Sequence, residues 1–394
     1  MDSSRSLASL TSLASLASLT DVPGLRVGHA TRTAPAHEGH LTGTTVVLAP
    51  AGGAVAAVDV RGGGPGTRET DALDPRNLVQ RVEAIVLTGG SAYGLDSASG
   101  VMAWLEEQGR GVRVGPDPSH VVPVVPAACV FDLGRGGDFT ARPDATTGRA
   151  AVEAAAGTEP FTPVEEGNVG AGTGAVVGKV KGGIGSASVR LESGVTVAAL
   201  VVANAAGSGV DPETGALYGR YFEGRRVDYP APEAHDEATR RLAEAAASAA
   251  SAASSSGSSS SPDSDSGSGS GSESGPPTLN TTLAVVATDA ELTKAQAQKL
   301  AGTSHDGMAR AVRPVHLLND GDTVFALATG ERPLPGAPQN PLALNEILAA
   351  GADMVTAAIV RALLAAESVE TPGGNFPSYR DLYDVQDRHG KQAQ

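Results

Sequence analysis

Residues 280–290 read NTTLAVVATDA, a polar start followed by an apolar run that predicts a buried β-strand over Thr282–Thr288. Directly before it, residues 246–277 are so rich in Ser, Gly and Asp that they offer little apolar surface to offset the entropy of ordering them. We therefore expect a disordered Ser/Gly linker over residues 246–280, which enters the core at Thr281.

Thr281 stands at this junction with Asn280 before it. Its hydroxyl could attack the Asn280 carbonyl, and an N-to-O acyl shift followed by hydrolysis would leave Thr281 as a new amino terminus. The free α-amino group, with a pKa of about 7.7–8.0, could then accept the hydroxyl proton. From these residues alone, an ordinary strand start remains the simpler interpretation of Thr281.

Outward from this stretch, strands and helices are predicted on both sides of the linker. Neither half has enough of them to close a core alone, so we expect the two halves to share one sheet system. Apolar runs predict strands at residues 44–48, 54–60, 84–88, 189–191, 195–203 and 323–329, and helices at 91–108, 233–246 and 291–300, the last capped by Asp289. Residues 344–366 are apolar nearly all round, which predicts a helix buried inside the protein.

Composition excludes several classes of protein. A net charge of −15 without clustered Lys and Arg argues against a nucleic-acid partner. Cys129 is the single cysteine, and no His or Cys spacing fits a zinc site, so we expect neither disulfide nor metal, and no cofactor. Serines interrupt the apolar residues of segment 1–20, which predicts a disordered tail. No apolar run is long enough to predict a membrane partner, so we expect a cytoplasmic protein.

Three motifs in register carry a family resemblance: TTLAVVATDA at residues 281–290, GNVGAGTG at 167–174 and LTGGSAYGL at 87–95. With them, the chain from Asp21 to Tyr383 resembles the L-aminopeptidase D-Ala-esterase/amidase (DmpA-like) family of N-terminal-nucleophile hydrolases, which includes the β-peptidyl aminopeptidases. The resemblance implies a four-layer α/β/β/α sandwich. It also implies self-cleavage at Asn280–Thr281 into an α part (residues 21–245 of the catalytic domain) and a β part (281–394). A homo-oligomer, usually a tetramer, is the implied assembly.

The resemblance further implies hydrolysis of small peptide or aminoacyl amide or ester substrates through a Thr281 acyl-enzyme. Asn204, at the end of a Val-Val-Ala-Asn run, matches the family's oxyanion donor. Asp320 and Asp322 stand where a small polar residue and an acid hold the nucleophile's hydroxyl and amino group, although the first is commonly Ser. The nearby His305 and His316 are interpreted as structural.

Two departures from the family concern the substrate. PVVPA at residues 123–127 lacks the acid that receives a substrate ammonium group, so exopeptidase specificity is in doubt. No Tyr lies between Tyr93 and Tyr218, so the second oxyanion donor is missing, and backbone amides of residues 170–174 are the expected replacement.

Two other functions stay open. An acyltransferase of the ornithine-acetyltransferase type resembles the chain in self-cleavage before Thr, but its Ala-Thr-Met-Leu motif is absent. A catalytically silent binding protein on the same scaffold is the non-enzymatic alternative.

Overall fold

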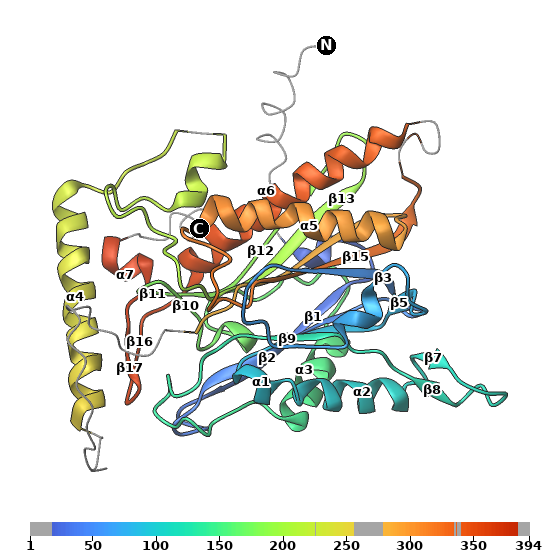
Figure 1. The fold of residues 1–394 in the computed structure, drawn as a ribbon, viewed down its shortest axis with the longest axis horizontal. Coiled ribbons are helices and arrows are strands. Elements are labelled where there is room, and N and C mark those ends of the chain that lie inside the picture. The colour runs from blue at the N-terminus through green and yellow to red at the C-terminus, as the bar shows by residue number, and fades with distance from the viewer. Residues whose placement is uncertain (1–17, 225, 256–278, 335, 337–339, 385–394) are drawn as a thin grey trace, which may run out of the picture.

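The computed structural model describes residues 18–224, 226–255, 279–334, 336 and 340–384 (Figure 1). Two large sheets form its centre. The first has the strand order β1-β2-β6-β9-β4 and the second the order β12-β13-β14-β15-β3-β5. Their strands are β1 (Arg26–Thr33), β2 (Leu41–Leu48), β6 (Ala84–Thr88), β9 (Ala127–Cys129), β4 (Thr67–Arg68), β12 (Gly183–Arg190), β13 (Thr196–Ala203), β14 (Leu283–Ala290), β15 (Thr323–Arg332), β3 (Ala54–Val60) and β5 (Arg81–Val82).

Helices cover the outer faces of both sheets (Figure 1). The helices of the described residues are α1 (Ser91–Gly94), α2 (Ser97–Glu107), α3 (Ala145–Gly157), α4 (Pro232–Ser255), α5 (Lys294–Ala311), α6 (Leu344–Ala365) and α7 (Tyr379–Tyr383). Of these, α2 and α3 cover the first sheet and α5 and α6 the second, whereas α4 and α7 lie to one side of the sandwich (Figure 1). Short 3-10 helices lie at Leu19–Asp21, Thr70–Leu73, Gly170–Gly172, Tyr218–Phe222 and Pro341–Ala343. Three two-stranded ribbons complete the described part of the chain: β7 (Val112–Arg113) with β8 (Val121–Val122), β10 (Val176–Val177) with β11 (Val180–Lys181), and β16 (Val369–Thr371) with β17 (Gly374–Phe376).

Alternation along β13 shows how the layers stack. Leu200 and Val202 pack between the two sheets with Val47 and Leu87 of the first sheet, whereas Val201 packs toward α5 and α6. Because successive strand residues point to opposite faces, both faces of this sheet are buried. On the other side, α2 and α3 pack against β2 and β6. The layers therefore run α/β/β/α, and the predicted four-layer sandwich is confirmed.

The parts of the chain on either side of the predicted linker share the second sheet. Strand β14 lies between β13, to which it is antiparallel, and β15, to which it is parallel. Strand β3, from the first part of the chain, pairs with the far edge of β15. Neither part could form this sheet without the other, as predicted.

Helix α6 explains the long apolar stretch near the end of the chain. It packs on β12, where a Cβ added to Gly185 would stand 2.1 Å from the Ala358 carbonyl oxygen. Among the described residues it is the one helix long and apolar enough to cross a membrane, and 61% of its apolar window is buried. Burial in the sandwich accounts for that composition.

The predicted disordered tail over residues 1–20 is wrong at its end. Ser18, Leu19 and Thr20 are buried, and the Leu19 amide donates to Ser186 Oγ at 2.7 Å. Leu19 supplies an apolar side chain to the space between the sheets, which offsets the entropy of ordering. Residues 1–17 lie outside the described part of the chain.

The predicted linker over residues 246–280 begins too early. Helix α4 continues to Ser255, because the Ala-rich start of this segment has high helix propensity. Residues 256–278 lie outside the described residues. At the other end, Asn280 is buried rather than part of a linker, with 5% of its surface exposed.

Two local predictions also fail. Asp289 does not cap a helix: it lies in β14, and its carboxylate accepts from the Thr196 amide at 2.8 Å and from Arg332 Nε at 3.1 Å. Helix α5 starts later, where Thr293 caps it in a box with Gln296. The single helix predicted over residues 91–108 is instead split into α1 and α2.

Candidate active site

Thr281 lies at the entrance to β14, in the middle of the second sheet. Its amide donates to the Asn204 carbonyl oxygen at 2.9 Å, and its hydroxyl donates to the Asn280 carbonyl oxygen at 2.7 Å. Thr281 is only 5% exposed. The hydroxyl is thus held against the peptide unit that precedes it.

The Asn280 carbonyl has a second donor. Its oxygen also accepts the Gly321 amide at 3.1 Å. A donor at this oxygen stabilises the negative charge that develops there when the carbonyl carbon is attacked. Gly321 can approach this closely because it lacks a side chain: a Cβ would stand 2.5 Å from Thr281 Oγ1.

Asn204 is fully buried and follows the last residue of β13. Its Oδ1 accepts from the Val176 amide at 3.0 Å and from an Arg135 guanidinium nitrogen at 2.6 Å. Its Nδ2 donates to the Thr281 carbonyl oxygen at 3.4 Å. Asn204 and Thr281 are therefore neighbours, as the resemblance implies.

Asp322 is buried next to Thr282, the residue that follows Thr281. One of its carboxylate oxygens accepts the Thr282 amide at 2.8 Å, and the other accepts both the amide and Nδ1 of His316, at 3.1 and 2.8 Å. This geometry fixes the chain on the carboxyl side of Thr281. His316, interpreted above as a structural residue, holds the Asp322 carboxylate through these two bonds.

Asp320 lies on the same loop. Its carboxylate accepts the Leu317 amide at 2.9 Å and the Ala206 amide at 3.4 Å, and burial raises its pKa. Direct contacts of Asp320 and Asp322 with the hydroxyl and amino group of Thr281 stay a prediction, since in the uncut chain these carboxylates bond to backbone amides and to His316.

The two histidines next to the site touch edge to face, with ring centroids 4.8 Å apart. His305 is fully buried, and its Nε2 lies 3.0 Å from the Asp59 carbonyl oxygen. Among the described residues, no group of three or more His, Cys, Asp or Glu side chains is arranged to hold a metal ion.

Four of the five backbone amides expected to supply the second oxyanion donor are already engaged, those of residues 170–173. Gly170 and Ala171 donate to the hydroxyls of Thr31 and Thr45, and the amides of Gly172 and Thr173 donate to carbonyl oxygens of their own turn. These four groups are therefore not free to bind an oxyanion. The Gly321 amide, which sequence reasoning missed, is the donor that reaches a carbonyl next to Thr281.

Two cations were also missed, the half-buried Arg135 and the fully buried Lys181. Arg135 follows β9 in a Gly-rich segment and bonds to Asn204, to the Gly174 carbonyl oxygen at 2.6 Å and to Asn280 Oδ1 at 2.7 Å. Desolvation lowers its pKa to about 10, so it remains charged near neutral pH. A charged residue inside a run of glycines and apolar residues was the available signal.

Lys181 is the second cation, and it is completely buried. Its Nζ donates to the carbonyl oxygens of Gly172, Ala175 and Gly182, at 3.1, 3.0 and 2.7 Å. Desolvation, and next the charge of Arg135, lower its pKa to about 7. Lys181 thus fixes the loop whose Gly174 carbonyl binds Arg135.

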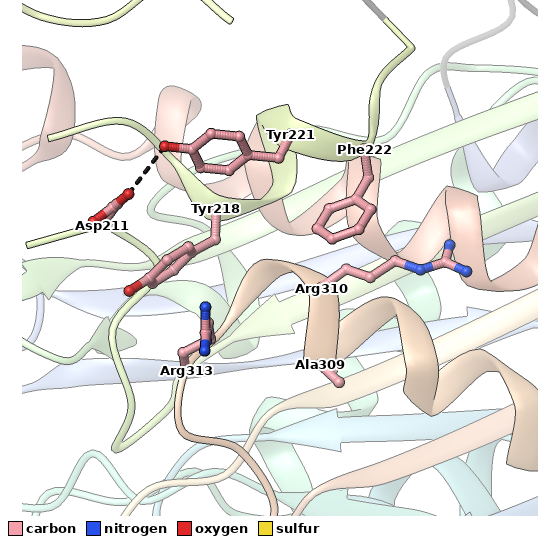
Figure 2. A pocket seen from close by; sticks show the side chains of 7 residues that line it. All are labelled: Asp211, Tyr218, Tyr221, Phe222, Ala309, Arg310 and Arg313. Atoms are coloured by element: carbon pink, nitrogen blue, oxygen red, sulfur yellow. Dashed lines mark hydrogen bonds between the residues drawn. The ribbon is translucent and has the colours of Figure 1, made fainter. Parts of the chain in front are cut away.

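A surface pocket of about 510 Å³ lies elsewhere, between the end of α5 and the 3-10 helix at Tyr218–Phe222 (Figure 2). Figure 2 shows Arg310 and Arg313 beside aromatic rings, with the Tyr221 hydroxyl bonded to Asp211. None of the predicted site residues lines this pocket.

The family model described as Peptidase family S58 matches residues 17–376. The chain belongs to Peptidase family S58. An uncharacterised aminopeptidase of Mycobacterium tuberculosis is 44% identical over 374 residues, covering 92% of this chain and 97% of that protein. A 6-aminohexanoate-oligomer endohydrolase of Kocuria sp. is 30% identical over 333 residues, covering 81% of this chain and 76% of that one.

Solved structures agree with this membership. A Burkholderia sp. β-aminopeptidase aligns with a TM-score of 0.65 at 25% identity, covering 97% of both chains. The L-aminopeptidase D-Ala-esterase/amidase of Ochrobactrum anthropi, described as a variant of the Ntn hydrolase fold, aligns with a TM-score of 0.63 at 21% identity over 95% of both chains. This S58 member is accordingly a peptide or amide hydrolase with an Ntn-type fold.

Gly321→Ala tests the close approach at the Asn280 carbonyl. The new methyl group must displace either the Thr281 hydroxyl or the Gly321 amide. We therefore expect the self-cleavage that the family resemblance implies at Asn280–Thr281 to slow by roughly a hundredfold, the effect typical of losing an oxyanion donor. The fraction of split chain is followed with time on a denaturing gel. Gly157→Ala, where nothing lies within 4 Å of the added Cβ, is the matched control. Equal rates of splitting in the two variants would count against this geometry.

Lys181 gives a pH-dependent stability. The unfolded chain binds the lysine proton up to pH values near 10.5 and the folded chain only up to about 7. Between these values the unfolded state holds more protons, so the free energy of unfolding should rise with pH, by a few kcal/mol relative to Lys181→Met. Urea unfolding at several pH values measures this, with both proteins carrying Thr281→Ala so that each unfolds as one chain. Parallel pH profiles for the two proteins would contradict the buried, titrating lysine.

Proposed function

We propose that this S58 hydrolase cuts its own chain between Asn280 and Thr281 and then hydrolyses small amide or ester substrates through an acyl-enzyme on Thr281. One observation carries the proposal. The Asn280 carbonyl oxygen receives both the Thr281 hydroxyl at 2.7 Å and the Gly321 amide at 3.1 Å. The nucleophile and a charge-stabilising donor thus meet at one carbonyl.

Self-cleavage follows from this arrangement. Thr281 Oγ attacks the Asn280 carbonyl carbon, and the Gly321 amide stabilises the oxyanion. The bond from the carbonyl carbon to the Thr281 nitrogen breaks, that nitrogen gains the proton lost by the hydroxyl, and an ester links Asn280 to Thr281 Oγ. Water then hydrolyses the ester, which leaves a carboxylate on Asn280 and a free amino group and hydroxyl on Thr281.

The same groups serve the substrate reaction. The α-amino group of Thr281, near the Asn204 carbonyl oxygen, accepts the hydroxyl proton while Oγ attacks the substrate carbonyl. The leaving amine takes that proton, and water releases the acyl group from Thr281. The Asn204 side-chain amide and the Gly321 backbone amide are the proposed donors to the oxyanions that form in self-cleavage and in substrate hydrolysis. Asp320 and Asp322 keep Thr281 and its neighbours in place.

The substrate class is a small peptide or amide. This proposal is supported by the names of two relatives, an aminopeptidase and a 6-aminohexanoate-oligomer endohydrolase. The segment PVVPA at residues 123–127 carries no acid for a substrate ammonium group. We therefore propose that a free amino end is not required on the acyl part of the substrate.

Replacement of Thr281 tests the proposal most directly. Wild-type protein should give two fragments on a denaturing gel, and the smaller one should begin Thr-Thr-Leu-Ala on N-terminal sequencing. Thr281→Ala lacks the hydroxyl, so it should stay in one piece and hydrolyse aminoacyl p-nitroanilides at least about a thousandfold more slowly, because the covalent step is lost.

Two matched variants complete this test. Thr281→Ser keeps a hydroxyl and should still split, whereas Thr282→Ser changes the next residue and should split like the wild type. A wild-type chain that hydrolyses the p-nitroanilides without being cut would refute the proposed mechanism.

A further inference from the structure

Arg135 connects the two asparagines of the site. One terminal guanidinium nitrogen donates to Asn204 Oδ1 and to the Gly174 carbonyl oxygen, and the other donates to Asn280 Oδ1 at 2.7 Å. No carboxylate accepts from Arg135 among these bonds. The neighbouring acid, Asp132, instead accepts the Gly90 amide at 2.7 Å.

In the proposed self-cleavage, Asn280 is the acyl group and Thr281 supplies the nitrogen. The Asn280 side chain therefore marks where a substituent lies when a carbonyl is held against Thr281 Oγ. Its backbone amide lies 3.3 Å from the Asn319 carbonyl oxygen, which marks where an α-nitrogen on the acyl group would lie. The residue before the cut is in effect the first acyl group to occupy this subsite.

Departure of Asn280 leaves one side of the guanidinium without its acceptor. An unpaired donor of a charged group in a largely desolvated site is unfavourable, so an acceptor brought by the substrate would be bound strongly. A cationic group at the same place would be repelled.

We propose that Arg135 determines specificity for the acyl part of the substrate, selecting acyl groups with a carbonyl or carboxylate oxygen where Asn280 Oδ1 lies. That oxygen sits on the third carbon counted from the scissile carbonyl carbon. Asparaginyl, aspartyl and succinyl groups have this spacing. The inference rests on the proposed function, since it takes Asn280 as the acyl group of the first reaction.

The test compares two substrates of nearly the same shape, the p-nitroanilides of L-asparagine and L-leucine, on processed protein. One hydrogen bond to a charged group corresponds to about a tenfold to a hundredfold preference. We expect the ratio of kcat/KM values to favour asparagine by at least about tenfold in the wild type. In Arg135→Met the ratio should fall to near one, and Arg135→Lys should retain part of the preference.

Arg149→Met is the matched control, because Arg149 is an exposed residue of α3 paired with Glu107 and Glu153 and should leave the ratio unchanged. A wild-type ratio within about threefold of one would overturn the proposal, and so would an unchanged ratio in Arg135→Met. Loss of overall activity alone would not decide between recognition and positioning, since Arg135 also orients Asn204; the ratio does.

A second measurement needs no variant and decides the matter if Arg135→Met fails to fold or to split. Succinate and butyrate differ by the second carboxylate, so succinate should inhibit hydrolysis of L-leucine p-nitroanilide at a concentration at least about tenfold lower. Equal inhibition by the two acids would overturn the proposal. A wild-type chain that never splits would refute the proposed function and this inference with it, whereas a split chain with no preference would refute only the role of Arg135.

Discussion

The carbonyl group of Asn280 is the point on which the site depends. Its oxygen is held by the Thr281 hydroxyl on one side and the Gly321 amide on the other. Sheet order makes this possible, because β14 lies between β13 and β15, and Thr281 precedes β14. Asn204 at the end of β13 and the loop that enters β15 must then meet Thr281 at the same end of these strands.

Close approach of the backbone segments at this end of the strands requires small residues. The loop with Asp320 and Asp322 packs against Gly62, where an added Cβ would stand 2.3 Å from the Asp322 amide nitrogen. Behind it, two cations hold backbone carbonyls instead of carboxylates. The buried Lys181 binds three carbonyls, and the half-buried Arg135 binds one together with two asparagine side chains. Charges placed this way cost desolvation energy, and that cost is why the lysine pKa falls to about 7.

The sequence predicted the layers well, because they follow from periodicity. Apolar runs on both sides of residues 256–278 indicated strands that had to share a core, and β13 and β14 lie where those runs stand. The motifs also brought Thr281 and Asn204 together. The predicted boundaries of elements were wrong where local sequence preferences set them. Alanine-rich sequence extends α4 to Ser255, and a capping box makes α5 start later than predicted.

Side-chain networks were harder to predict, because they join residues far apart in sequence. Nothing local connects Arg135 to Asn204 and Asn280, which lie 69 and 145 residues further along the chain. The carbonyls that Lys181 binds are within nine residues of it, but only the turn between β10 and β11 and the loop before them bring those oxygens to its Nζ. A backbone donor such as the Gly321 amide has no sequence signature at all. The amides of residues 170–173 looked available only because a glycine-rich motif does not show which of its groups are already bonded. The contact of His316 with Asp322 was not predicted for a similar reason, since it depends on the turn that brings the two residues together.

The sheet also explains how the fold could survive loss of a peptide bond at its centre. Pairing of β14 with both neighbours begins at Leu283, two residues beyond Thr281, so a cut before Thr281 removes none of those strand pairs. On the carboxyl side of the cut, the Thr282 amide stays bonded to Asp322. The Thr281 nitrogen already donates to the Asn204 carbonyl oxygen, and an amino group can keep that bond while gaining a lone pair that accepts a proton. The arrangement that holds the chain before cleavage is therefore the one that would hold a free amino terminus beside its own hydroxyl.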